Sequence, residues 1–110
     1  MEVRAQAKGV RVSPKKARRV VDMVRGKSAD EALAILNFTP SPTARKVARV
    51  VRSAVANAEN NYQMAPSDLK VTRAYVDKGP MMKRVRYAGR GRVSPILKRI
   101  SHITVVVEEI

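Results

Sequence analysis

Two strand-like segments, placed symmetrically about a pair of glycines, constrain the fold of this 110-residue chain more than any other feature. Residues 69–76 and 100–107 are rich in β-branched and aromatic side chains with partial alternation, which is typical of strands. If the segments pair antiparallel in register, the turn falls near residues 89 and 90, where Gly89-Arg90-Gly91 can adopt positive φ. The sequence therefore predicts one long β-hairpin.

This hairpin is too long for a body of this size to cover. Each arm has about 20 residues and would extend roughly 65 Å at about 3.3 Å per residue. A domain of about 100 residues has a radius of gyration of only about 13 Å. We expect a single domain, 1–110, with a globular part at about 1–77 and 101–110 and an extended arm at about 78–100.

The arm is strongly basic. Between residues 78 and 99 there is no acidic residue, and the whole chain has 23 Lys and Arg against 9 Asp and Glu, a net charge of +14. The basic residues of the arm are Lys78, Lys83, Arg84, Arg86, Arg90, Arg92, Lys98 and Arg99. Because a two-stranded ribbon is marginally stable alone in water, we expect an anionic partner to hold it. Nucleic acid is the first choice and an acidic membrane the second.

Three helices are predicted before the hairpin. Ser13 and Pro14 form an N-cap with proline at the first helical position, and Gly26 stops a helix over Pro14 to Arg25. Ser28 and Glu31 fit a capping box at the start of a short second helix that carries no basic residue.

The third helix is the longest. Small apolar residues recur at three- and four-residue steps over residues 44–58, after a break at Pro40-Ser41-Pro42 and before Asn60-Asn61. Residues 3–12 are predicted as a short strand or an extended arm. These elements predict an α+β fold in which three helices pack on a small antiparallel sheet, with a long extended basic β-hairpin.

A second basic cluster lies on the first helix. Its members are Lys15, Lys16, Arg18, Arg19 and Arg25. Two cationic surfaces joined by one core suggest contact with separate backbone segments of a folded RNA. Because the chain has only four aromatic residues, we expect it to recognise shape and phosphates rather than stacked single-stranded bases. His102 could hydrogen-bond RNA or pack within its strand.

Enzymatic activity is not expected. The chain has no Cys and one His, and its carboxylates are scattered, so neither a metal site, a cofactor site nor an acid–base pair is predicted. No apolar run approaches the roughly 20 residues that span a bilayer, and no signal-peptide pattern is evident, so we expect a cytosolic protein. A membrane-surface helix at 43–58 would lack bulky apolar residues.

Several blocks of the sequence resemble one family over essentially the whole chain, namely bacterial large-subunit ribosomal protein L twenty-two. These blocks are Ser13-Pro14-Lys15-Lys16-Ala17-Arg18-Arg19-Val20-Val21-Asp22, Arg25-Gly26-Lys27, residues 54–60, Ala74-Tyr75-Val76-Asp77, Gly79-Pro80, Lys83-Arg84, Gly91-Arg92 and Lys98-Arg99-Ile100-Ser101-His102-Ile103-Thr104-Val105-Val106-Val107. The resemblance implies a structural protein of the cytoplasmic ribosome, anchored on large-subunit ribosomal RNA (rRNA) near the exit of the polypeptide tunnel.

The resemblance also implies roles for particular residues. Lys83, Arg84 and Arg92 correspond to hairpin residues, and Lys15, Arg18, Arg19 and Arg25 to the RNA-facing helix. The resemblance implies that the hairpin tip, residues 87–91, lines the tunnel. Implied partners are ribosomal protein L four, which meets the hairpin at a constriction, and the nascent polypeptide. The sequence departs from the family at the hairpin tip, Tyr87-Ala88-Gly89-Arg90-Gly91, where Pro-Arg-Ala is common at the first three positions.

The alternative hypothesis is an architectural DNA-bending protein with basic β-arms. Such proteins usually dimerise and insert an apolar wedge at a base step. The predicted apex, Gly89-Arg90-Gly91, offers no wedge, and we expect the free protein to be a monomer.

Overall fold

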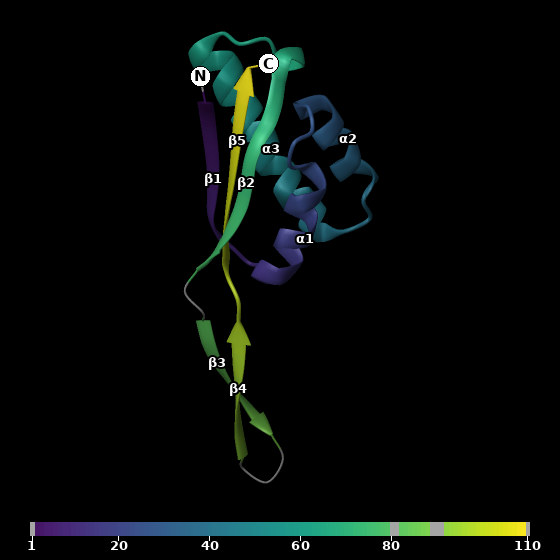
Figure 1. Ribbon diagram of the computed structural model, residues 1–110. Coiled ribbons are helices and arrows are strands. Elements are labelled where there is room, and N and C mark those ends of the chain that lie inside the picture. The colour runs from purple at the N-terminus through teal and green to yellow at the C-terminus, as the bar shows by residue number, and fades with distance from the viewer. Residues whose placement is uncertain (1, 80–81, 89–91, 110) are drawn as a thin grey trace.

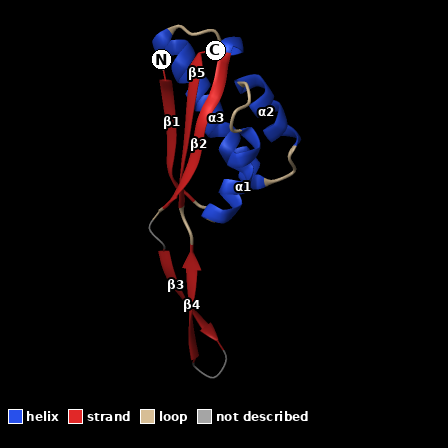
Figure 2. Cartoon of the chain, viewed as in Figure 1, coloured by secondary structure: helices blue, strands red, loops and turns tan. Residues whose placement is uncertain are grey.

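In the computed structural model, the helices lie on one face of a small sheet, and a β-ribbon continues from one end of that sheet (Figures 1 and 2). The structure describes residues 2–79, 82–88 and 92–109. The three-stranded antiparallel sheet has the order β1-β5-β2, and β3 pairs with β4 in a separate two-stranded sheet. The elements are β1 Glu2–Val10, α1 Pro14–Val24, α2 Ala29–Phe38, α3 Pro42–Tyr62, the short 3-10 helix η1 Pro66–Asp68, β2 Leu69–Lys78, β3 Met82–Ala88, β4 Arg92–Lys98 and β5 Ser101–Glu109. The predicted α+β class is confirmed.

The predicted hairpin pairing is also confirmed. In the body, β2 pairs antiparallel with β5, and Asp77 faces His102. In the ribbon, Met82 faces Lys98 and Ala88 faces Arg92, so β3 and β4 are symmetric about position 90. The predicted turn residues, Gly89-Arg90-Gly91, lie outside the described residues.

The hairpin is shorter than the extended-chain expectation. The longest dimension of the molecule is 61 Å, and the other two are 26 and 17 Å. The estimate of roughly 65 Å for the arms alone assumed a full rise per residue, whereas twisted strands rise less. The first half of each arm, in β2 and β5, is also part of the body, where β1 completes the sheet along the other edge of β5.

Gly79 marks the junction between the body and the ribbon. Its backbone N–H donates to the carbonyl oxygen of Ile100 at 2.8 Å. A Cβ atom at this position would lie 2.9 Å from Cγ2 of Ile100 and 3.2 Å from Cε1 of His102. Glycine is therefore required here by the close approach of the two chain segments.

The two helix caps that the sequence predicts, at Ser13 and Ser28, are confirmed, and Ser41, expected only as part of a break in the chain, caps α3 as well. The hydroxyl oxygens of Ser13, Ser28 and Ser41 accept hydrogen bonds from the first turns of α1, α2 and α3. The C-terminal ends of two helices differ by one or two residues from the expectation. α1 ends at Val24, because the Arg25 backbone is already extended, and α3 continues to Tyr62, where Gln63 adopts a left-handed φ of 54°.

The core is aliphatic. α3 contributes small side chains such as Ala44, Ala54 and Ala58, which are fully buried and allow close contact with neighbouring elements. Ile103, Val105 and Val107 of the central strand β5 are also fully buried. The apolar face of α3 is thus used mainly by the core.

Candidate nucleic-acid interface

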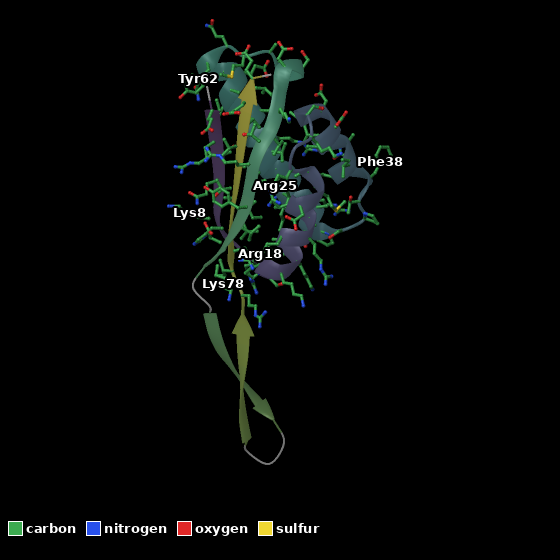
Figure 3. All side chains as sticks on the ribbon, viewed as in Figure 1. Lys8, Arg18, Arg25, Phe38, Tyr62 and Lys78 are labelled. Atoms are coloured by element: carbon green, nitrogen blue, oxygen red, sulfur yellow. The ribbon has the colours of Figure 1, made fainter. Side chains whose placement is uncertain are left out.

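α1 presents its predicted basic residues to solvent. Lys15, Lys16, Arg18 and Arg19 are exposed, whereas the intervening Ala17 and the following Val20, Val21 and Val24 are buried. This pattern follows from helical periodicity, since residues three and four apart share a face. The four basic residues lie in the first two turns of α1, which begins at the end of the body from which the ribbon projects (Figure 1). Figure 3 labels Arg18 at this end.

A groove at this end brings together basic residues from four parts of the chain. It has a volume of about 820 Å³ and lies between the segment that follows β1, the start of α1, the start of α3 and the segment before β5. Its five cationic residues are Arg11, Lys16, Arg19, Lys46 and Arg99. No carboxylate is among the described residues that line this groove. We call it the cationic groove.

Two helix N-termini strengthen the positive potential of the cationic groove. Ser13 and Ser41, the N-caps of α1 and α3, both line it. Neither helix has an acidic residue in its first turn, whereas α2 has Asp30 and Glu31 in its first turn. Because the N-terminus of a helix carries about half a positive charge, α1 and α3 leave theirs available to an external anion.

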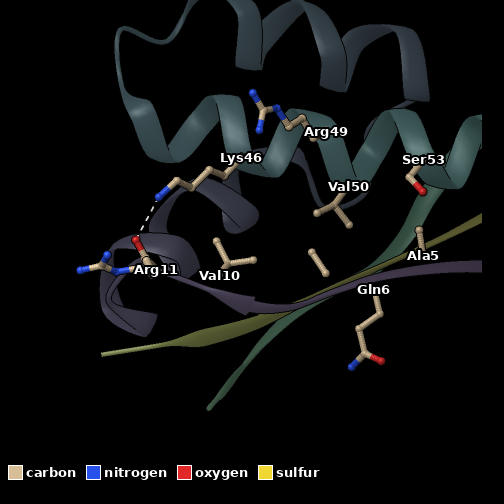
Figure 4. A pocket seen from close by; sticks show the side chains of 9 residues that line it. Ala5, Gln6, Val10, Arg11, Lys46, Arg49, Val50 and Ser53 are labelled. Carbon is tan, nitrogen blue, oxygen red and sulfur yellow. Dashed lines mark hydrogen bonds between the residues drawn. The ribbon is translucent and has the colours of Figure 1, made fainter. Parts of the chain in front are cut away.

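Lys46 connects the wall of the cationic groove to the end of β1. Its Nζ donates to the backbone carbonyl oxygen of Arg11 at 2.9 Å, as Figure 4 shows. Behind this contact lies a second cavity of about 380 Å³ between β1 and α3, lined in part by Val10, Arg49 and Val50. The Lys46 bond links α3 to the segment after β1.

A smaller cavity at the base of the ribbon collects four of the predicted RNA contacts. It has a volume of about 290 Å³, and Lys15, Arg18, Lys78 and Arg99 line it with Gly79. Arg18 is positioned here by its Nη2, which donates to the carbonyl oxygen of Val76 at 3.3 Å. Arg99 lines both this cavity and the cationic groove, so the two form one continuous basic surface.

Arg25, the residue that follows α1, is placed differently from the basic residues within the helix. Its Nε donates to the carbonyl oxygen of Ala74 at 3.1 Å, its Nη2 donates to the same oxygen, and its Nη1 bonds the Asp22 carboxylate at 2.7 Å. β2 is an edge strand, and these bonds cover its outer edge. These bonds give Arg25 a structural role at the edge of the sheet. Its assignment as an RNA contact stays a prediction.

His102 is partly exposed and has a partner within the protein. Its Nδ1 accepts a hydrogen bond of 3.1 Å from the backbone N–H of Gly9. Gly9 has a φ of 72° and lies where the β1–β5 register shifts, between Ala7 and Val10. An accepting Nδ1 requires the proton on Nε2, which remains a donor toward other groups. A contact with RNA through Nε2 stays a prediction.

The remaining predicted residues belong to the ribbon. Lys83, Arg84, Arg86, Tyr87 and Ala88 lie on β3, and Arg92 and Lys98 lie on β4. The predicted tip residues Gly89, Arg90 and Gly91 lie outside the described residues.

Sequence reasoning missed Arg11 and Lys46 as parts of the site. Both are basic residues next to a turn or a helix start, which is a weak signal in a chain with this charge. Only the packing of α3 beside the end of β1 brings them to the cationic groove.

Acidic residues gather at the opposite end of the body. In the sheet, Glu2 faces Glu108, and Glu109 faces Leu69, close to the two chain ends marked in Figure 1. Glu2 also forms an ion pair with Arg73. The body is thus electrostatically polar, with its most basic surface at the base of the ribbon.

Neither a metal-binding cluster nor a membrane-spanning helix is found in the described part of the chain. Among these residues, no group of three or more His, Cys, Asp or Glu could hold a metal ion. None of the described helices is both long enough and apolar enough to span a membrane.

Comparison with known proteins gives the family. The profile of the family described as "Ribosomal protein L22p/L17e" matches residues 5–108. The "Large ribosomal subunit protein uL22" of Dehalococcoides mccartyi strain 195 is 57% identical over 109 residues, which cover 99% of this chain and 100% of the relative. The protein of the same name from Halothermothrix orenii is 55% identical, with coverage of 99% and 96%. The resemblance in the sequence blocks is thereby confirmed, and the chain belongs to the ribosomal protein L22p/L17e family.

Proposed function

We propose that this protein is a structural, non-enzymatic component of the large subunit of the cytoplasmic ribosome, where it binds rRNA. The observation that carries the proposal is the cationic groove, in which five basic side chains and two helix N-termini converge without an opposing carboxylate among the described lining residues. Like charges held this close repel one another, so an anion bound between them relieves the repulsion. The family to which the chain belongs supports rRNA as that anion.

The groove binds RNA by neutralising phosphates. Lys16 and Arg19 project from α1, and Arg99 comes from the segment before β5, so one phosphate backbone can contact two elements. Lys15, Arg18 and Lys78 continue the basic surface at the base of the ribbon. Phosphate contacts position a protein on RNA and make its affinity strongly dependent on salt. The protein thereby allows rRNA segments that repel one another to pack together.

The ribbon extends this interaction away from the body. We propose that β3, β4 and the tip enter the subunit interior and line the polypeptide exit tunnel, where they contact ribosomal protein L four and the nascent polypeptide. Two features support this. β3 and β4 pair only with each other in the described sheet, and a two-stranded ribbon needs an external partner for stability. The ribbon sequence is basic and contains no acidic residue.

The proposal is tested by rRNA binding as a function of salt. For about six to ten phosphate contacts, the affinity for large-subunit rRNA should fall about 10³–10⁵-fold between about 50 and 200 mM salt. The double variant Lys16→Glu and Arg19→Glu should weaken binding at low salt and reduce the salt slope. The matched control is Arg4→Glu with Lys27→Glu, which makes the same charge change at exposed positions outside the two basic cavities.

Two results would contradict this function. One is a flat salt dependence, and the other is an equal loss of affinity in the groove variant and its control. Sedimentation of the tagged protein from a lysate, at low and at high salt, provides the cellular test. Stoichiometric migration with large subunits is expected, whereas recovery with duplex DNA would favour the DNA-bending alternative.

A further inference from the structure

Phe38 is the most exposed large apolar side chain described in the protein. It is the only Phe of the chain, lies at the last position of α2, and is 88% exposed. Among the residues whose burial the structure describes, the other exposed large apolar side chains, Met23, Tyr62 and Tyr75, are between 41% and 51% exposed. Figure 3 shows Phe38 pointing away from the body at the end of α2. A phenyl ring in water gains free energy when a partner covers it.

The backbone that carries Phe38 is well held. The backbone N–H of Thr39 donates to the carbonyl oxygen of Ile35 at 3.1 Å, and the Thr39 hydroxyl donates to the same oxygen at 2.8 Å. The N–H of Ser41 then donates to the carbonyl oxygen of Thr39 at 2.9 Å, across Pro40. These bonds close the end of α2 and the connection to α3. The backbone from which the ring projects is therefore held in place, which lowers the part of the entropy cost of binding that comes from ordering the backbone.

Three arginines share a cavity lining with Phe38. Phe38 lines a cavity of about 430 Å³ together with Arg45, Arg49 and Arg52 of α3. No acidic residue is among the described groups that form its walls. Nη2 of Arg52 donates to Oδ1 of Asn37 at 3.3 Å, which ties this guanidinium to the end of α2. A single aromatic ring thus stands beside three cations, on a different part of the body from the cationic groove.

We propose that Phe38 and these arginines bind one unpaired nucleotide of RNA. The base stacks on the phenyl ring, and the guanidinium groups of Arg45, Arg49 and Arg52 contact the flanking phosphates. This inference rests on the proposed function, because it takes rRNA as the partner. An unpaired base offers a flat apolar face next to negative charge, which is the chemistry that this surface complements. The core of a protein–protein interface would instead require several adjoining exposed apolar side chains, and among the described residues that line this cavity only Pro40 adds exposed apolar surface to the ring.

This stacking role refines the expectation from composition. Four aromatic residues argue against a continuous single-stranded platform, but one exposed ring suffices for one base. The cationic groove then provides affinity through phosphates, and Phe38 adds selectivity for an RNA site with an unpaired, unstacked base.

A tryptophan at this position reports stacking directly. The chain has no Trp, so Phe38→Trp introduces a single indole that can be excited apart from the three Tyr. Binding of in vitro transcribed large-subunit rRNA should quench its fluorescence strongly, because a stacked base quenches indole emission. The control is Tyr62→Trp, at the other end of α3 and 51% exposed in the native residue, where little quenching is expected.

Affinity measurements complete the test. Phe38→Ala should weaken rRNA binding about five-fold or more, while Phe38→Tyr should retain it, because stacking contributes about that much per base. Phe38→Leu keeps an apolar side chain without a stacking face and should behave like Phe38→Ala. All three should fold normally, since the side chain contributes little to the core.

The outcomes separate this inference from the proposed function. If the unmodified protein binds rRNA but Phe38→Ala binds equally well and the indole is not quenched, the stacking site is wrong and the proposed function stands. If Phe38→Leu retains full affinity, the ring does not stack on a base. A crosslink from position 38 to a protein in assembled subunits would assign the ring to a protein partner and overturn the proposal. If the unmodified protein does not bind rRNA at low salt, both proposals fail.

Discussion

The two halves of the long hairpin use the same kind of strand pairing in different surroundings. In the body, β2 and β5 belong to a three-stranded sheet whose inner face packs on the helices. In the ribbon, β3 and β4 have only each other as sheet partners. The pairing remains antiparallel from one half to the other, and Gly79 and Ile100 make the connection.

This difference shows what backbone pairing alone provides. Inter-strand hydrogen bonds replace bonds to water, so their net contribution is small, and burial of apolar side chains provides most of the stability. β5 buries Ile103, Val105 and Val107 against the helices, and Arg25 covers the outer edge of β2. The body should therefore fold without RNA, whereas the ribbon depends on what it binds.

Removing a core side chain from β5 should have the largest effect on folding. Ile103 is fully buried, and Ile103→Ala should lower the free energy of unfolding by about 2–5 kcal/mol, because it leaves a cavity in a core that cannot close over it. Urea denaturation followed by circular dichroism measures this loss. Met23→Ala, at a position 41% exposed, should change the free energy by less than about 1 kcal/mol. Equal effects in the two variants would contradict the importance of burial in the body.

Removing the Arg25 side chain that covers the edge of β2 should have an intermediate effect on the free energy of unfolding. Arg25→Ala should lower the free energy of unfolding by about 1–2 kcal/mol, because the carbonyl of Ala74 and the carboxylate of Asp22 lose a charged donor that is itself 46% exposed. Thermal denaturation and rRNA affinity should be measured together. Lys15→Ala is the control, since it should lower affinity without changing stability. The same behaviour in Arg25→Ala would make Arg25 an RNA contact and not a support of the sheet.

Removing the ribbon should have the smallest effect on the body. We expect that replacing residues 80–98 with Asn-Gly, which favours a tight turn, will leave the free energy of unfolding within about 1 kcal/mol of the original. The affinity for rRNA should still fall about tenfold or more, because the variant loses six basic residues of the sequence. The six are Lys83, Arg84, Arg86, Arg90, Arg92 and Lys98. An unfolded variant would show that the ribbon supports the body.

Much of the fold could be predicted because its signals are local. Ser13 and Ser28 begin helices since a serine oxygen can accept bonds from the next turn, whatever the rest of the chain does. The antiparallel pairing of the hairpin followed from the symmetry of two β-branched segments about Gly89-Arg90-Gly91, but the register shift between Val71 and Arg73 did not. The end of α3 was less predictable, because Asn60 and Asn61 continue the helix and the left-handed turn falls at Gln63.

The candidate site was only partly predictable because it depends on non-local packing. Lys15, Arg18, Lys78 and Arg99 were identified from charge, and the structure brings them together at the base of the ribbon. Charge alone did not separate Arg25, which bonds the edge of β2, from its neighbours. It also did not reveal the exposure of Phe38, which depends on how α2 meets α3.

The sequence by itself determined the elements, the hairpin, the basic character and the family resemblance, because each depends on neighbouring residues or on composition. Only the tertiary structure decided which charges act together. Arg11, Lys46 and Arg99 are far apart along the chain, and they share the cationic groove because the helices and the sheet pack around one core. Electrostatic interactions depend on distance in space, so the position of a binding surface is fixed only when the core is formed.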